Sequence, residues 1–171
     1  MKSQAMREVW RSAINLIKPP PHLTISQWAN KFRFLSTESS SEAGKFETSR
    51  AIFQKEIMNS INDPSIDEVV VMSCSQIGKT EILLNAIGYY IHYAPAPILI
   101  VHPTLEMARA WSQDRLAPMI RDTEILKYKV AEVKSKDSGN TVLHKIFDGG
   151  HITACGANSP ASLASRPIKI V

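Results

Sequence analysis

Ser73-Cys74-Ser75-Gln76-Ile77-Gly78-Lys79-Thr80 is the most informative segment of this 171-residue sequence. The Walker A pattern for phosphate binding is Gly-x-x-x-x-Gly-Lys-Ser/Thr, and the segment fits it except that Ser73 replaces the first glycine. The β-branched run Glu68–Met72 precedes the segment and predicts a buried strand, while the apolar stretch Thr80–Tyr93 predicts a helix. Because a strand and a helix flank the pattern, we expect a phosphate site here.

The residue types of this loop suit a nucleotide. A tight loop turns its backbone N–H groups toward phosphate oxygens, and the following helix adds the positive end of its dipole. Gly78 lets the backbone come close, Lys79 would reach the β- and γ-phosphates as a catalytic residue, and the Thr80 hydroxyl would ligate the metal. We therefore expect ATP and Mg²⁺ as cofactors. The residues expected to contact the nucleotide are Ser73, Cys74, Ser75, Gln76, Ile77, Gly78, Lys79 and Thr80.

Plainer interpretations of these residues stay open at this point. Lys79 could be a solvated lysine at a helix start and Gly78 an ordinary turn residue, which would leave the agreement with strand and helix to coincidence. Gln76 could satisfy backbone groups alone, and Cys74 is interpreted as a small packed residue rather than a nucleophile. Upstream, the amide of Gln54 offers a donor and an acceptor that could read an adenine edge. Without that role it would be a surface glutamine beside a core phenylalanine.

The alternation of strands and helices indicates an α/β fold with a mainly parallel sheet flanked by helices, and the Walker A-like segment indicates the P-loop NTPase type of this fold. In such sheets ligands bind at the carboxyl ends of the strands. The further elements predicted after residue 49 are a helix at Arg50–Ile61 with the apolar residues Ile52, Phe53, Ile57 and Ile61, a strand at Pro97–Val101, a helix at Leu105–Leu116 capped by Thr104, a hairpin of Thr141–Phe147 and His151–Cys155, and a strand at Ile168–Val171.

The first part of the chain is predicted to be a separate, helical and irregular segment. Residues 4–17 have helical spacing and end at three prolines, a short helix is expected at Ile25–Lys31, and the polar stretch 35–46 is expected to be a loop. The predicted organisation is thus an N-terminal segment, 1–48, and a P-loop ATPase domain, 49–171. The first fifty residues carry eight basic and four acidic side chains, whereas the rest carries twelve of each. This small basic excess fits a solvated surface or a flank that touches nucleic acid.

Composition places few other constraints on function. A hydrophobic fraction of 44% and a charged fraction of 21% are ordinary for a globular protein. No run approaches the roughly 18 apolar residues of a membrane-spanning helix, and the N-terminus lacks signal-peptide features, so no membrane partner is expected. Cys74 and Cys155 have no metal-ligand spacing, and we expect both to be free thiols in a reducing, cytoplasmic setting.

Several motifs in order resemble one family, the lambda-type (GpA-like) phage terminase large subunit. The likeness covers nearly all of residues 24–171. The segments that carry it are Trp28–Ser36, Glu42–Thr48, Phe53-Gln54, Val69–Glu81, Ile98–Thr104, Glu106–Met119, Asp137–Asn140 and Gly156–Pro167.

This resemblance implies a P-loop motor of the additional-strand, catalytic-glutamate class. Gln54 would be the adenine-reading glutamine, and Ser73–Thr80 would be a deviant Walker A motif. Arg166 would be the arginine before the Walker B strand, a catalytic candidate that senses phosphate or acts across a subunit boundary. Its alternative is an arginine that only caps a turn. The resemblance places the start of the Walker B strand at Ile168–Val171, with the magnesium aspartate and catalytic glutamate beyond it, so this piece of the ATPase domain is expected to bind ATP and hydrolyse it poorly.

The function that the resemblance implies is ATP-driven packaging of double-stranded DNA into a procapsid, with a C-terminal nuclease in the full-length protein. The implied partners are double-stranded DNA, the small terminase subunit, the portal protein and further copies of the chain in a ring, within the cytoplasm of the bacterial host. Two alternatives remain open. One is a helicase-like ATPase that remodels nucleic acid, and the other is a non-catalytic prophage remnant with a vestigial phosphate loop.

Overall fold

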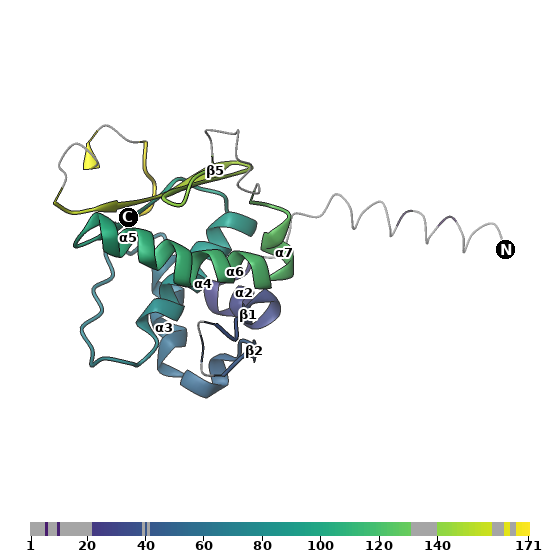
Figure 1. Cartoon of the computed structure of the whole chain (residues 1–171). Helices are drawn as coiled ribbons and strands as arrows, with labels where there is room; N and C mark the ends of the chain where they lie inside the picture. Colours follow the sequence, from purple (N-terminus) through teal and green to yellow (C-terminus); the bar gives the residue numbers. More distant parts are fainter. Residues whose placement is uncertain are drawn as a thin grey trace.

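The computed structural model describes Met6, Trp10 and residues 22–38, 40, 42–130, 140–158, 163–164 and 167–171. The helix predicted at residues 4–17 therefore lies outside the described residues except for Met6 and Trp10, which are helical and exposed. The described elements are α2 (Ile25–Phe32), β1 (Phe34–Leu35), β2 (Gly44–Lys45), the 3₁₀ turn η1 (Thr48–Ala51), α3 (Phe53–Ile61), α4 (Lys79–His92), β3 (Ile98–His102), α5 (Leu105–Trp111), the π-helical turn η2 (Ser112–Leu116), α6 (Ala117–Asp122), α7 (Glu124–Lys127), β4 (His144–Phe147) and β5 (Gly150–Gly156) (Figure 1).

A mixed sheet with the strand order β3-β5-β4 carries the α/β character of the fold. β3 runs parallel to β5, with Ile98 opposite Ile152, and β4 runs antiparallel to β5. The predicted hairpin is confirmed, and its Asp-Gly turn uses the positive φ of 84° at Gly149. At the other edge, Ile170 forms an isolated parallel bridge to Ile98, so the strand predicted at Ile168–Val171 is present only as this single pairing.

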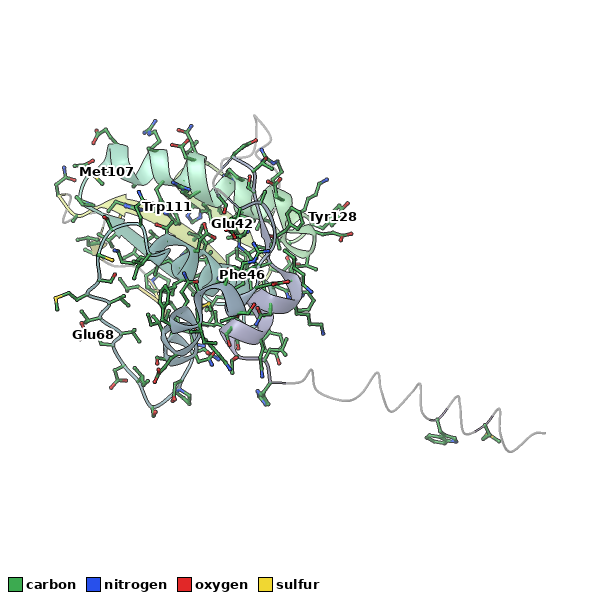
Figure 2. The ribbon with its side chains drawn as sticks, turned by 90° about the horizontal axis from the view of Figure 1, so that it is seen from below. Glu42, Phe46, Glu68, Met107, Trp111 and Tyr128 are labelled. Carbon is green, nitrogen blue, oxygen red and sulfur yellow. The ribbon has the colours of Figure 1, made fainter. Side chains whose placement is uncertain are left out.

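The segment Glu68–Met72 does not form the strand predicted for it. Its backbone is irregular, every residue from 63 to 76 is exposed, and Met72 is 97% accessible. Figure 2 shows Glu68 on an open loop at the periphery of the molecule. β-branched residues favour a strand only where a neighbouring strand accepts their backbone hydrogen bonds and a core covers their side chains. Within the described residues no strand pairs with this segment, so the strand preference of its β-branched residues is not sufficient to form a strand.

The helices α2, α3 and α4 pack into one core, and α4, which forms the helix predicted at Thr80–Tyr93, is buried on most sides. Trp28 on α2 is fully buried against Gly88 of α4, where an added Cβ would lie 2.3 Å from the indole. The indole N–H also donates to Nδ1 of His92, at 3.0 Å. Helix α2 therefore shares its core with α4, while a domain boundary at residues 48–49 stays a prediction.

The buried face of α3 differs from the one predicted. Ile52 and Phe53 are 67% and 51% exposed, whereas Gln54 and Met58 are buried. Gln54 and Met58 are four residues apart and therefore lie on one helix face, which turns toward α4 and the loop before it. Met58 receives a hydrogen bond from Asn85 at its sulfur, at 3.4 Å. The glutamine is thus buried beside an exposed phenylalanine, the reverse of the plainer interpretation above.

The helix predicted at Leu105–Leu116 begins as expected, since the Thr104 side chain accepts a hydrogen bond from the Met107 N–H at 3.2 Å. It continues through the π-helical turn into α6 and ends at Asp122. Pro118 in α6 cannot donate to the helix ladder, and the wider π turn just before it eases the clash of its ring with the preceding turn. None of the described helices is long and apolar enough to cross a membrane.

Candidate functional site

The loop from Ser73 to Gly78 turns sharply into the first residue of α4. Gln76 and Gly78 adopt positive φ angles of 65° and 85°. Gly78 occupies the N-cap position of α4, and its carbonyl accepts hydrogen bonds from the N–H groups of Glu81 and Ile82, at 3.0 and 3.2 Å. The N-terminal end of a fourteen-residue helix is therefore joined directly to the loop.

The ammonium group of Lys79 lies inside this loop. Its Nζ donates to the carbonyl of Cys74 at 2.6 Å, to Oγ of Ser73 at 3.2 Å and to the carbonyl of Ser73 at 3.5 Å. The hydrogen bonds of the Lys79 ammonium thus join Ser73 and Lys79, the first and seventh residues of the Walker A-like pattern. Cys74 itself is exposed, so its interpretation as a packed residue is wrong, whereas both cysteines are free thiols as predicted.

Gln54 reaches the same loop from α3. Its side chain is buried, and Nε2 donates to the carbonyl of Ile77 at 3.1 Å. A Cβ at position 78 would lie 2.4 Å from that nitrogen and would displace the Gln54 amide, and the φ of 85° at this position favours glycine. A hydrogen bond from its side chain to a backbone carbonyl therefore joins Gln54 to the loop at residues 73–78, while its contact with an adenine stays a prediction.

The other residues predicted for the nucleotide site are Ser75, Gln76, Thr80 and Arg166. Ser75 and Gln76 are exposed in the turn, and Thr80 is half-buried in the first turn of α4. Arg166 lies outside the described residues. Within the part of the chain that the structure describes, no group of three or more His, Cys, Asp or Glu residues is placed to hold a metal ion. A hydroxyl such as that of Thr80 fits Mg²⁺ as one ligand beside phosphate oxygens and water.

The neighbouring groove lies against α4 and the edge of β3. Its volume is about 810 Å³, and its lining residues include Lys79, Leu83, Ile98–His102, Val171 and the exposed Val69 and Val71. The groove therefore extends from Lys79, next to the loop at residues 73–78, to the edge of β3. His102 packs against Trp111 with ring centroids 5.3 Å apart, and burial lowers the pKa of its imidazole.

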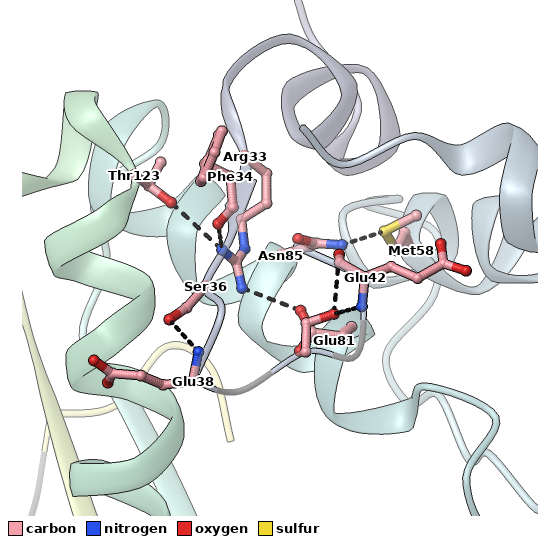
Figure 3. Close-up of polar contacts among 10 residues, drawn as sticks. Arg33, Phe34, Ser36, Glu38, Glu42, Met58, Glu81, Asn85 and Thr123 are labelled. Atoms are coloured by element: carbon pink, nitrogen blue, oxygen red, sulfur yellow. Dashed lines mark hydrogen bonds and ion pairs between the residues drawn. The ribbon is translucent and has the colours of Figure 1, made fainter. Parts of the chain in front are cut away.

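Sequence reasoning missed one charged residue next to the loop. Arg33 has a fully buried side chain, and its Nη2 lies 3.1 Å from Oε2 of Glu81, the residue after Thr80 (Figure 3). Its neighbours Phe32 and Phe34 indicate an apolar environment, but nothing in the local sequence points to a partner 48 residues away.

Comparisons with known proteins show which family the chain is similar to. The family model described as "Phage terminase large subunit gpA, ATPase domain" matches residues 40–171. Terminase large subunits of Enterobacteria phage P21 and Escherichia phage lambda are 33% and 30% identical over 137 and 136 residues. Each match covers 80% of this chain and 21% of the relative, so the chain spans about a fifth of the length of these curated relatives. No solved structure matches the chain.

Proposed function

Because this chain belongs to the family of phage terminase large subunit gpA ATPase domains, we propose that its residues 73–80 bind ATP with Mg²⁺ for a DNA-packaging motor. The observation that carries the proposal is the position of the Lys79 ammonium between the carbonyl of Cys74 and the hydroxyl of Ser73. A lysine held inside a loop of this shape can exchange those oxygens for phosphate oxygens without a large movement of the chain.

Each residue around the loop would have a separate role in nucleotide binding. Lys79 neutralises phosphate charge, and the N-terminal end of α4 adds its partial positive charge. Thr80 would hold Mg²⁺, which when bound spreads the charge of the β- and γ-phosphates. Gln54 would fix the carbonyl of Ile77 through its hydrogen bond, and its proposed contact with the adenine base rests on the family resemblance. Gln76 and Ser75 face solvent at the turn, from which their backbone N–H groups could reach phosphate oxygens.

The P-loop NTPase class and its additional-strand, catalytic-glutamate division are part of this proposal. Three features support them: a Walker A-like loop that opens a long helix, the parallel pair β3–β5, and the parallel bridge from Ile98 to Ile170. A catalytic role of Arg166 remains part of the proposal as a prediction.

For the whole protein we propose an ATP-driven translocase that moves double-stranded DNA into a procapsid and cuts it with a nuclease domain. Its partners would be the small terminase subunit, the portal protein and further copies in a ring, in the cytoplasm of the bacterial host. The support is the family and the two terminase relatives, of which the chain spans 21%.

Titration with a fluorescent ATP analogue in the presence of Mg²⁺ tests the nucleotide site. Lys79→Ala removes charge-assisted hydrogen bonds worth about 1.5–3 kcal/mol, so we expect the dissociation constant to rise about tenfold or more. Lys127→Ala, an exposed lysine on α7, is the matched control and should leave binding unchanged. Micromolar binding that depends on Lys79 supports the proposal, whereas equal binding by both variants would refute it and favour a vestigial loop.

A further inference from the structure

Arg33 occupies an environment that arginine rarely tolerates. It follows α2 as its C-cap residue, and its side chain is fully buried. Arginine is almost never fully buried unless a partner compensates its charge. Nη2 is paired with Glu81, and Nη1 donates to the carbonyl of Phe34 and, at 3.5 Å, to the hydroxyl of Thr123 (Figure 3). Nε has no hydrogen-bond partner among the described residues.

The partner carboxylate lies in the turn that presents the candidate phosphate-binding residues. Glu81 follows Lys79 and Thr80 directly, its N–H donates to the carbonyl of Gly78 at 3.0 Å, and its side chain is 18% exposed. Whatever fixes the position of Glu81 therefore also fixes the first turn of α4. Arg33 reaches this turn from α2, far away in the sequence.

Stability alone does not account for such a pair. The cost of removing both charges from water offsets most of their attraction, and apolar residues of similar volume often replace buried ion pairs without loss of stability. What the pair provides is a defined geometry, because the planar guanidinium holds its donors at fixed angles. It also neutralises a carboxylate that would otherwise stand one residue from Thr80 and repel phosphate.

We propose that Arg33 is a positioning residue of the nucleotide site, which acts through Glu81. It holds the first turn of α4 so that Lys79 and Thr80 face the phosphates and the metal, and it cancels the negative charge beside them. Gln54 holds the other side of the loop through Ile77. This inference rests on the proposed function, because it assigns a role within that same site.

The first test compares nucleotide binding by wild type, Arg33→Gln, Glu81→Gln and the double variant Arg33→Gln/Glu81→Gln. Arg33→Gln leaves the Glu81 charge unpaired and should raise the dissociation constant for the fluorescent ATP analogue about tenfold. Glu81→Gln in the same chain removes the repulsion and should recover much of that loss. Recovery by a second uncharged residue is not expected if Arg33 only fills space. Arg121→Gln, which removes an exposed ion pair to Asp122, is the control and should bind like wild type.

The second test does not depend on nucleotide. Hydrogen exchange should be faster in Arg33→Gln at the amides of Glu81 and Ile82, and unchanged at Tyr93, whose amide closes the other end of α4. If Arg33→Gln does not fold, Arg33→Lys keeps the charge without the planar donors and should show the same local increase. A folded variant with wild-type exchange at Glu81 and Ile82 overturns the proposal. If wild type binds no nucleotide, the proposed function fails, while the exchange rates still decide whether Arg33 holds the turn.

Discussion

Exchanging Gln54 for glutamate replaces one buried donor by an acceptor of the same shape. In the wild-type chain Nε2 of Gln54 donates to the carbonyl of Ile77 at 3.1 Å, in a position with 5% exposure. The glutamate would place a carboxylate oxygen against that carbonyl. The loop must then turn the carbonyl of Ile77 away, or the carboxylate must take up a proton.

The magnitude follows from these contacts. A buried hydrogen bond that is lost with one partner left unsatisfied costs about 1–3 kcal/mol. If this cost falls on the loop conformation that binds phosphate, affinity falls about 5- to 150-fold. The melting temperature should fall as well, because the same hydrogen bond joins α3 to the loop before α4 in the absence of ligand.

The assay is titration of the fluorescent ATP analogue onto Gln54→Glu, with Gln27→Glu as the matched control. Gln27 is exposed on α2, and its Oε1 accepts a hydrogen bond from the Thr24 N–H at 3.0 Å in a capping box. A glutamate accepts the same bond, so the control should keep wild-type stability and binding. If Gln54→Glu matches the control in both measurements, Gln54 does not hold the loop.

Three further perturbations test the fold around the site. Gly88→Ala places a Cβ 2.3 Å from the Trp28 indole, so urea unfolding should show a loss of about 1–3 kcal/mol although alanine favours helices, and a gain would contradict the packing described. Gln76→Gly relieves a left-handed φ of 65°, which costs a non-glycine residue about 1–2 kcal/mol, but it adds about 0.4–1 kcal/mol of conformational entropy to the unfolded chain. The difference should raise the melting temperature slightly, whereas a lower melting temperature would mean that the Gln76 side chain stabilises the turn. Burial, then the charges of Lys129 and Lys31, lower the pKa of His92, and burial lowers that of His102. The unfolded chain therefore binds more protons below about pH 6.5, and the free energy of unfolding should fall as the pH falls from 7 to 5. The fall should be smaller in His92→Gln, and an equal fall in that variant would mean that His92 does not contribute.

Local chemistry was sufficient to predict several parts of this protein from its sequence. The Thr104 cap depends on one side chain and an N–H three residues away, and the Asp148-Gly149 turn depends on a single positive φ. Helix α4 and strand β3 follow from apolar runs whose lengths suit one element each. The ordered motifs likewise led to the terminase family, which the family model and both relatives confirm.

Only the tertiary structure decided which of these residues meet. Glu68–Met72 has the composition of a strand, but a strand also requires a neighbour, and the described residues provide none for it. The apolar residues of α3 suggested a buried Phe53, yet the helix buries Gln54, because the Gln54 amide donates a hydrogen bond to the backbone carbonyl of Ile77 in the loop before α4. Arg33 and Glu81 become partners only because α2 packs across α4. Hydrogen-bond and charge compensation between distant segments depend on three-dimensional proximity, which periodicity and propensity along the chain do not specify.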